Sequence, residues 1–279
     1  MTRIDSPSNP RILAAARALA RGERMPIEGT RMLAEALDAG VVPDIVFFEE
    51  RGKEEKDRSD REGNHGEGNR PDEHDPGLLR KVEERGAALV RVSARVLRKL
   101  SDLPSARGIV ALARIPALDL DAASSSLSRQ SLVVLLDGVQ DPANVGAIVR
   151  SAEAFGAEAV LLTVGSALPF TARSLRASAG SALRIPIAAA LSPEEVVTWA
   201  RARGAVLAGA EARGGEAPES LAGIRPLVLA IGSEGHGFSP AVSKGLGRRI
   251  TIPLAGRVES LNAAVAAAVL LYTLSGRTR

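Results

Sequence analysis

Cysteine is missing from the 279-residue sequence, which excludes disulfides, thiolate zinc sites and a cysteine nucleophile. Aromatic residues make up 3% of the chain, too few for the stacking surfaces with which single-strand-binding proteins hold bases. No apolar run is long enough to span a membrane, and Arg11, Arg17 and Arg21 interrupt the segment where a signal peptide needs apolar residues. We therefore expect a cytoplasmic protein that binds neither a membrane nor a metal.

Charge is a weaker indicator of the partner. The chain has 36 basic and 33 acidic residues, and 31 of the basic residues are arginine. The arginine side chain is a planar fork that suits phosphate, but a GC-rich genome produces the same bias. Charge alone therefore does not identify a nucleic-acid-binding protein.

The first part of the chain, residues 1–115, alternates short helical and strand patterns and predicts a small α/β domain. Helices are expected over 9–21, 31–40 and 94–103, strands over 41–50 and 108–116, and a helix followed by a strand over 77–93. Residues 51–76 contain no apolar side chain and predict a disordered polar insertion. His65 and His74 lie in this insertion, and we interpret them as solvated rather than as metal ligands.

The second part of the chain has a different pattern. Residues 116–130 are polar and rich in serine, and we interpret them as a linker. Residues 131–279 contain nearly continuous apolar strands separated by helical segments; the strands are expected over 131–139, 157–164, 183–190, 205–212, 226–232 and 249–254. Continuous apolar strands that alternate with helices indicate a parallel sheet covered on both faces.

The first candidate site follows the first of these strands, because ligands of an open parallel sheet bind beyond the carboxyl ends of its strands. Asp141 and Pro142 predict an N-cap and the first helical residue. Asn144 and Arg150 follow on the same helix. Taken alone, they are typical of a polar first-turn residue and a surface charge.

The second candidate site is the glycine-rich segment 231–237, IGSEGHG. Glycine allows backbone to approach a ligand closely and permits positive φ. The segment lacks the lysine of a phosphate loop and comes too late in the domain for a dinucleotide fingerprint. The segment suits a ligand with a flat, neutral part. The alternative interpretation is a simple tight turn that leads into a helix. His236 is expected to be exposed rather than catalytic.

The third candidate site joins the last expected strand, which ends at Pro253 and Leu254, to an alanine-rich helix. This helix is expected to open near Ser260, Leu261 and Asn262, with Ser260 as the candidate N-cap. Its many alanines predict close packing against neighbouring elements.

In this order, DPANVGAIVRSAEAFG, IGSEGHG and IPLAGRVESLNAAVAAAVLLY resemble the three signature motifs of the SpoU (TrmH-type) RNA 2′-O-ribose methyltransferases of the SPOUT superfamily. The resemblance implies a SPOUT α/β domain with a C-terminal deep trefoil knot over 131–279, and a homodimer. SPSNPRILAAARALARGE and IEGTRMLAEALDAG are similar to the L30e-like RNA-binding domain that precedes it in many rRNA-directed members. The 51–76 insertion is not part of that family pattern.

The resemblance also implies a reaction, which is transfer of a methyl group from S-adenosylmethionine to a ribose 2′-hydroxyl, without a metal. Arg150 matches the residue proposed to promote deprotonation of that hydroxyl, or it grips a neighbouring phosphate, because arginine itself is a poor base. Asn144, Glu234, Ser260 and Asn262 match the other active-site residues of the family.

The cofactor site follows from the same resemblance. The methyl donor is expected to lie against Gly232, Ile252 and Leu261, with Gly237 and Leu254 as further walls. Many family members have methionine where this chain has Leu254, which is a mild apolar exchange.

An ideal helix places Asn144 and Arg150 about 240° apart around its axis. Either Asn144 precedes the regular helix or the long side chain of Arg150 swings around it. In the family, active sites form across the homodimer, so the two residues are able to serve different roles.

Two interpretations from other classes stay open. The first is an RNA-binding or ribosome-assembly factor without activity, which the intact motif residues disfavour. The second is a nucleotide-binding oxidoreductase, which the missing early glycine fingerprint disfavours. Within the methyltransferase interpretation, the L30e-like domain favours 23S-type rRNA over tRNA, by analogy between folds.

Overall fold

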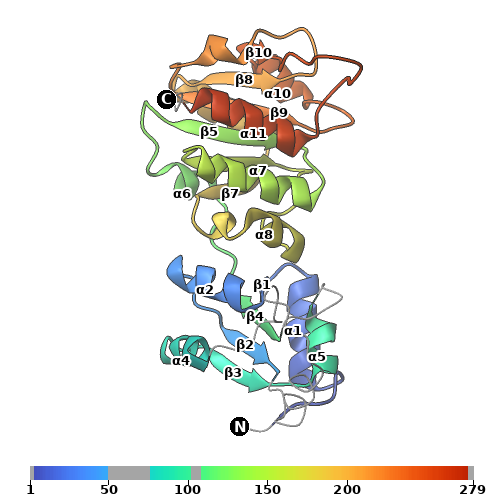
Figure 1. Ribbon diagram of the computed structural model, residues 1–279. Coiled ribbons are helices and arrows are strands. Elements are labelled where there is room, and N and C mark those ends of the chain that lie inside the picture. Colours follow the sequence, from blue (N-terminus) through green and yellow to red (C-terminus); the bar gives the residue numbers. More distant parts are fainter. Residues whose placement is uncertain (1–2, 50–75, 102–107, 276–279) are drawn as a thin grey trace. The chain divides into compact units, whose positions relative to one another are not determined.

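The computed structural model describes residues 3–49, 76–101 and 108–275. The chain forms two compact units, Met1–Ile115 and Pro116–Arg279, each with its own β-sheet (Figure 1). The insertion expected at 51–76 lies outside the described residues except for Pro76, and so do His65 and His74.

The first unit has a four-stranded sheet of order β1-β4-β2-β3. Its strands are β1 (Met25–Glu28), β2 (Ile45–Phe48), β3 (Ala88–Arg91) and β4 (Ile109–Ala113). β2 and β3 run parallel, whereas β4 is antiparallel to β1 and β2. Helices cover both faces: α1 (Pro10–Ala20) and α5 (Ala94–Leu100) on one, α2 (Thr30–Asp38) and α4 (Pro76–Glu84) on the other (Figure 1).

The periodicity of α1 and α5 explains why they pack on the sheet. Ile12 of α1 and Leu97 of α5 are fully buried and share one core cluster with Phe47 of β2. The opposite faces of both helices are exposed. Apolar residues on one face of each helix therefore fix α1 and α5 side by side on this sheet.

The second unit has a six-stranded sheet of order β10-β8-β9-β5-β6-β7, and every neighbouring pair is parallel. The strands are β5 (Leu132–Asp137), β6 (Ala159–Thr163), β7 (Ile187–Leu191), β8 (Val206–Ala210), β9 (Leu227–Gly232) and β10 (Arg248–Ile250). The parallel α/β class predicted for residues 131–279 is confirmed.

Helices cover both faces of this sheet, as the continuous apolar strands require. One face carries α6 (Leu120–Ser124), α9 (Pro193–Ala202) and α10 (Pro240–Gly245). The other carries α7 (Pro142–Ala154) and α11 (Ala263–Leu274), with α8 (Ala172–Ser178) packed on α7. Short 3-10 turns complete the connections at η1 (Ser181–Leu183) and η2 (Pro218–Leu221).

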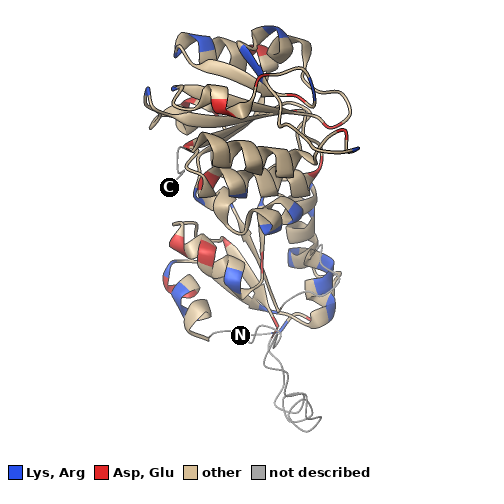
Figure 2. Cartoon of the chain, turned by 45° about the horizontal axis from the view of Figure 1, so that its top comes forward, with Lys and Arg blue, Asp and Glu red and all other residues tan. Residues whose placement is uncertain are grey.

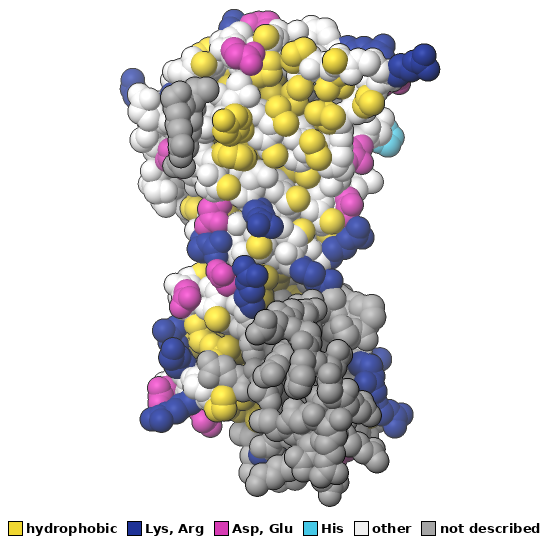
Figure 3. Space-filling model, in the orientation of Figure 1, with side chains coloured by type: hydrophobic (Ala, Val, Ile, Leu, Met, Phe, Trp, Pro, Cys, Tyr) yellow, Lys and Arg dark blue, Asp and Glu magenta, His cyan; other side chains and the backbone are white. Residues whose placement is uncertain are grey.

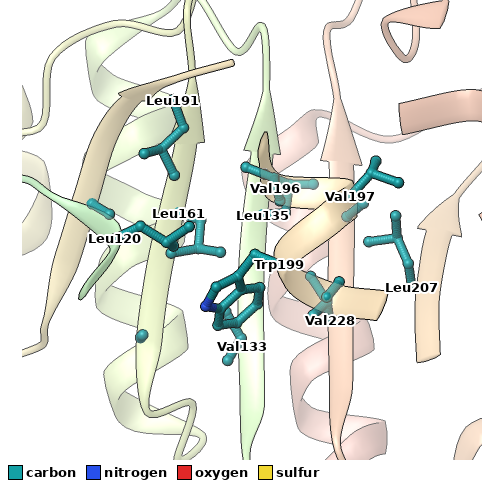
Figure 4. Close-up of a cluster of buried hydrophobic side chains, with 14 of the residues drawn as sticks. Leu120, Val133, Leu135, Leu161, Leu191, Val196, Val197, Trp199, Leu207 and Val228 are labelled. Carbon is teal, nitrogen blue, oxygen red and sulfur yellow. The ribbon is translucent and has the colours of Figure 1, made fainter. Parts of the chain in front are cut away.

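Figure 4 shows the core on the α9 side of the sheet. Trp199 of α9 lies over the strands beside Val133, and Leu120 of α6 lies beside Leu161. Alternate residues of β5 point the other way, so that Val134 is buried on the α7 and α11 side. Buried side chains therefore pack against helices on both faces of the sheet.

The strand order reverses direction next to β5. The chain moves outward from β5 through β6 to β7, then crosses back to β8 and β9 on the other side of β5. Open α/β sheets bind ligands at the carboxyl ends of the strands next to such a reversal, which here are β5 and β9. The first two candidate motifs follow these two strands.

Several elements differ from their sequence-based predictions. β1 was not predicted, because its four residues include Pro26; β1 tolerates proline because it lies at the edge of the sheet. The expected linker contains α6, whose Leu120 and Ala123 are buried in the core of the second unit. The strand expected over 249–254 ends at Ile250, and Pro253 lies in the following loop.

Candidate active site

A cavity of about 560 Å³ opens at the carboxyl ends of β8, β9 and β10. Its lining includes all five residues predicted to hold a cofactor, which are Gly232, Gly237, Ile252, Leu254 and Leu261. Glu234 and Ser260 also lie on its wall, and Leu270 of α11 forms part of the floor. The volume is within the range of pockets that enclose nucleoside-sized ligands.

The glycine-rich segment folds back on itself at the cavity wall. Ser233 and Gly237 exchange two backbone hydrogen bonds, each 2.9 Å long. Gly237 has a φ of +67°, and a Cβ built on Gly232 would lie 2.8 Å from the backbone of Gly237. Gly232 therefore has no room for a side chain, and its backbone faces the cavity directly.

Three motif residues from distant parts of the chain meet beside this cavity. Oε1 of Glu234 accepts hydrogen bonds from Nδ2 of Asn144 at 2.9 Å, Nδ2 of Asn262 at 3.1 Å and the backbone N–H of Ala263 at 3.3 Å. Nδ2 of Asn262 also donates to Oδ1 of Asn144 at 3.1 Å. We call Asn144, Glu234 and Asn262 the amide–carboxylate cluster.

The helix ends explain why these side chains converge. Asp141 caps α7 through its side chain, with Pro142 at the first helical position, as predicted, and Asn144 lies in the first turn. Asn262 rather than Ser260 caps α11, because its Oδ1 accepts from the N–H groups of Ala264 and Val265. Glu234 thus sits at the positive end of α11.

Arg150 is not part of the amide–carboxylate cluster. It lies within α7, as Asn144 does, but its side chain is exposed while Asn144 is buried. Both residues belong to regular helix, so the first of the two arrangements considered for them does not occur. Within the described part of the chain, Arg150 forms no ion pair.

Two functional candidates were missed by the sequence reasoning. Glu211 lines the cavity just after β8, and its Oε1 accepts a hydrogen bond from Nη1 of Arg249. Nη2 of Arg249 donates to the backbone oxygen and Oγ of Ser243. A carboxylate one residue past a strand that neighbours the glycine-rich strand is the signal that points to Glu211.

The second missed residue is Asp137, the last residue of β5. Its buried carboxylate accepts from Oγ1 of Thr163 at 2.8 Å and from the backbone N–H of Ser239 at 2.7 Å. Ser239 directly precedes α10, so Asp137 ties the end of the glycine-rich loop to the sheet. An aspartate that ends an otherwise apolar strand is the visible signal in the sequence.

Among the described residues, no group of three His, Cys, Asp or Glu side chains is arranged to hold a metal ion. No helix in the described ranges has both the length and the apolar character needed to cross a bilayer.

A known protein family matches most of the second unit. Residues 131–272 match the model of the SpoU rRNA Methylase family. An uncharacterized tRNA/rRNA methyltransferase of Mycolicibacterium paratuberculosis is 44% identical over 161 residues, which cover 57% of this chain and 51% of that protein. The chain spans about half the length of the curated relatives it matches.

Solved structures resemble the chain over nearly its whole length. A crystal structure of an RNA 2′-O ribose methyltransferase is similar with a TM-score of 0.75 and 29% identity, over 98% of both chains. The SpoU methyltransferase AviRb from Streptomyces viridochromogenes, crystallised with AdoMet, is similar with a TM-score of 0.78 and 26% identity, over 96% of this chain and 98% of that one.

Proposed function

Because the chain belongs to the SpoU rRNA methylase family, we propose that it transfers the methyl group of S-adenosylmethionine to the 2′-hydroxyl of a ribose in RNA. The observation that carries the proposal is one cavity at the carboxyl ends of β8, β9 and β10, with the amide–carboxylate cluster at its edge. The 2′ oxygen attacks the methyl carbon as the carbon–sulfur bond breaks, and the hydroxyl proton passes to an acceptor.

The cavity fits the proposed cofactor in size and in chemistry. Backbone at Gly232 and the apolar side chains of Ile252, Leu254 and Leu261 suit the flat, neutral adenine ring. The carboxylate of Glu211 suits the ribose hydroxyls or the positive charge of the donor. S-adenosylmethionine supplies an activated methyl group on a sulfonium, so the reaction needs no metal.

We assign the amide–carboxylate cluster the task of holding the three motifs in one arrangement. Glu234 uses Oε1 for all three of its hydrogen bonds, and its Oε2 has no partner among the described residues. This oxygen is free to accept a hydrogen bond from the RNA. Ser260 lies on the cavity wall and supplies a further hydroxyl close to the cofactor.

We propose that the active site is completed by a second copy of the chain. Val265, Val269 and Tyr272 of α11 are 49%, 39% and 56% exposed and lie three or four residues apart, so they form one apolar stripe. Figure 3 shows apolar side chains gathered over the second unit in this view. A two-fold contact through this stripe gives a homodimer.

In the proposed dimer, Arg150 contributes to the active site of the partner. α7 packs against α11, and the ring of Phe155 contacts that of Tyr272 edge-on at 5.7 Å. The C-terminal end of α7 therefore borders the apolar stripe. We propose that the exposed Arg150 of α7 reaches the partner's cavity, where its guanidinium grips the phosphate next to the target ribose or promotes loss of the hydroxyl proton.

The proposed substrate class is inferred from the fold of the first unit. Its sheet and its four described helices suit the L30e-like domain suggested by the motifs, and such domains bind RNA in rRNA-directed members of the family. We therefore propose 23S-type rRNA as the substrate, with tRNA as the alternative. The deep trefoil knot expected at the C-terminal end of the 131–279 domain belongs to the same proposal.

Transfer of tritium from labelled S-adenosylmethionine to total ribosomal RNA and to total tRNA tests this function. Digestion to nucleosides follows, and the proposal predicts label in a 2′-O-methylribonucleoside from rRNA. Label in a methylated base would refute ribose chemistry, and label in tRNA alone would refute the choice of substrate.

A further inference from the structure

The two faces of the first unit differ in charge. α1 and α5 carry Arg11, Arg17, Arg95, Arg98 and Lys99, all exposed, and contain no acidic residue. α2 and α4 on the opposite face carry both signs, with Arg80 paired to Glu84 at 2.8 Å. Figure 2 shows these two helix pairs with blue alone on one and with red and blue on the other.

The five cations lie on two neighbouring helices, and each of them is exposed. α1 packs against α5, and Ile4 and Val92, which precede the two helices, form a parallel bridge. The buried residues Ile12 and Leu97 turn the opposite faces of both helices to solvent. We call Arg11, Arg17, Arg95, Arg98 and Lys99 the α1/α5 basic surface.

Helix stability accounts for only part of the α1/α5 basic surface: Arg17, Arg98 and Lys99 lie in last turns, where the helix dipole favours cations. Arg11 and Arg95 are each the second residue of their helix, where the helix dipole favours anions and disfavours cations. Arg95 and Lys99 are spaced i,i+4 on α5, so their like charges repel. Within the described part of the chain, Arg11, Arg95, Arg98 and Lys99 form no ion pair.

We propose that the α1/α5 basic surface binds the phosphate backbone of the RNA substrate. Phosphates neutralise the repulsion between these side chains, and the guanidinium fork matches a phosphate in two hydrogen bonds. The contact reads no base sequence, so it adds affinity and orientation rather than specificity. The inference rests on the proposed RNA substrate and is confined to the first unit.

The test compares two triple variants with equal loss of charge. Arg11→Gln/Arg95→Gln/Arg98→Gln removes three cations from the basic surface, and Arg31→Gln/Arg80→Gln/Lys81→Gln removes three from α2 and α4. Glutamine keeps the helix propensity of the replaced residues. Binding of a short fluorescein-labelled RNA hairpin is measured by anisotropy across a salt series, and thermal unfolding checks that both variants fold.

The basic-surface variant is expected to lower the slope of log affinity against log salt by about 2 to 3. The ratio of the affinity of the unchanged protein to that of this variant then falls roughly 15- to 60-fold between about 50 and about 200 mM salt. The α2/α4 variant is expected to keep the original slope. Equal losses in both variants, or no loss in either, would overturn the proposal.

Two further measurements separate this inference from the proposed function. Calorimetric titration with S-adenosylmethionine reports on the second unit, and it is expected to be the same in both variants. RNA binding through the basic surface without cofactor binding would refute the methyltransferase proposal but support the RNA contact proposed for the α1/α5 basic surface. Equally salt-sensitive binding of poly-glutamate would point to an acidic protein partner and overturn the assignment to RNA.

Discussion

Asn144 and Asn262 are 118 residues apart in the chain, yet Nδ2 of Asn262 donates a hydrogen bond to Oδ1 of Asn144 at 3.1 Å. Both amides also donate to the same oxygen of Glu234. This contact joins the first turn of α7, the loop after β9 and the start of α11. Three segments that are separate motifs in the sequence thus meet in the amide–carboxylate cluster beside the cavity.

Replacing Asn262 tests whether the amide–carboxylate cluster shapes the cavity. Asn262→Ala removes an N-cap and two hydrogen bonds of the cluster, so it is expected to lower both stability and cofactor affinity. Asn9→Ala is the matched control, because Asn9 caps α1 in the first unit in the same way. Loss of the cap is expected to cost about 1 kcal/mol in the free energy of unfolding in each variant, and Asn262→Ala is expected to lose more because the two cluster hydrogen bonds go as well.

Calorimetric titration with S-adenosylmethionine distinguishes the two variants. Asn262→Ala is expected to bind more weakly by about tenfold, which corresponds to ~1.4 kcal/mol. Asn9→Ala is expected to bind as the unchanged protein does. Equal affinities in the two variants would show that the cluster has no part in the cavity.

The glycine-rich loop allows a similarly matched comparison. A Cβ at Gly232 would lie 2.8 Å from the backbone of Gly237, whereas a Cβ at Gly235 has nothing within 4 Å. Gly232→Ala is therefore expected to displace the loop and abolish measurable cofactor binding, while Gly235→Ala leaves it unchanged. Titration of both variants checks this, and normal binding by Gly232→Ala would contradict the position assigned to the cofactor.

The buried carboxylate of Asp137 is expected to stabilise the site as a whole. Asp137→Ala leaves the N–H of Ser239 and the hydroxyl of Thr163 without their acceptor. The expected loss is about 2 to 4 kcal/mol in the free energy of unfolding, measured by urea denaturation. Thr198→Ala on α9 loses only an exposed hydrogen bond and serves as control; equal losses would exclude a special role for Asp137.

The ion pair between Glu153 and Arg184 predicts a pH dependence of stability. The hydrogen bond from Arg184 holds the pKa of Glu153 below its ordinary value of 4.5. A lowered pKa in the folded state stabilises the protein above about pH 4.5, and this contribution is lost as the pH falls through the folded-state value.

Glu153→Gln is accordingly expected to be less stable at neutral pH by about 0.5 to 1 kcal/mol, because the pair is partly exposed. The difference from the unchanged protein is expected to vanish in acid. Thermal unfolding between neutral and acidic pH measures it, and a difference that stays constant with pH would contradict the assigned cause.

Arg150 carries the mechanistic part of the proposal. Arg150→Ala is expected to reduce methyl transfer about a hundredfold or more while leaving cofactor affinity unchanged. Arg201→Ala, on the other face of the sheet, is the control. Near-normal turnover by Arg150→Ala would remove Arg150 from the mechanism.

The dimer adds a second expectation for Arg150. Mixing Arg150→Ala with Asn144→Ala chains is expected to restore one complete site per mixed dimer, and with it part of the activity. No recovery in mixtures shown to contain mixed dimers would place Arg150 and Asn144 in the same subunit's site.

The sequence predicted the parallel sheet because its strands are buried on both faces and therefore read as continuous apolar runs. It missed α6, since a helix of five residues among serines leaves little periodicity, although Leu120 is buried. It placed the N-cap of α11 at Ser260 because serine and asparagine are equally suited to that position. The choice of Asn262 depends on Glu234, which is distant in sequence.

The central claim is that the cavity beside the amide–carboxylate cluster binds S-adenosylmethionine. Calorimetric titration of the purified full chain with S-adenosylmethionine, with NAD as the control ligand, tests it most directly. The account predicts saturable binding of S-adenosylmethionine at one site per chain, no binding of NAD, and loss of binding in Gly232→Ala. Binding of NAD alone, or S-adenosylmethionine binding unaffected by Gly232→Ala, would contradict it.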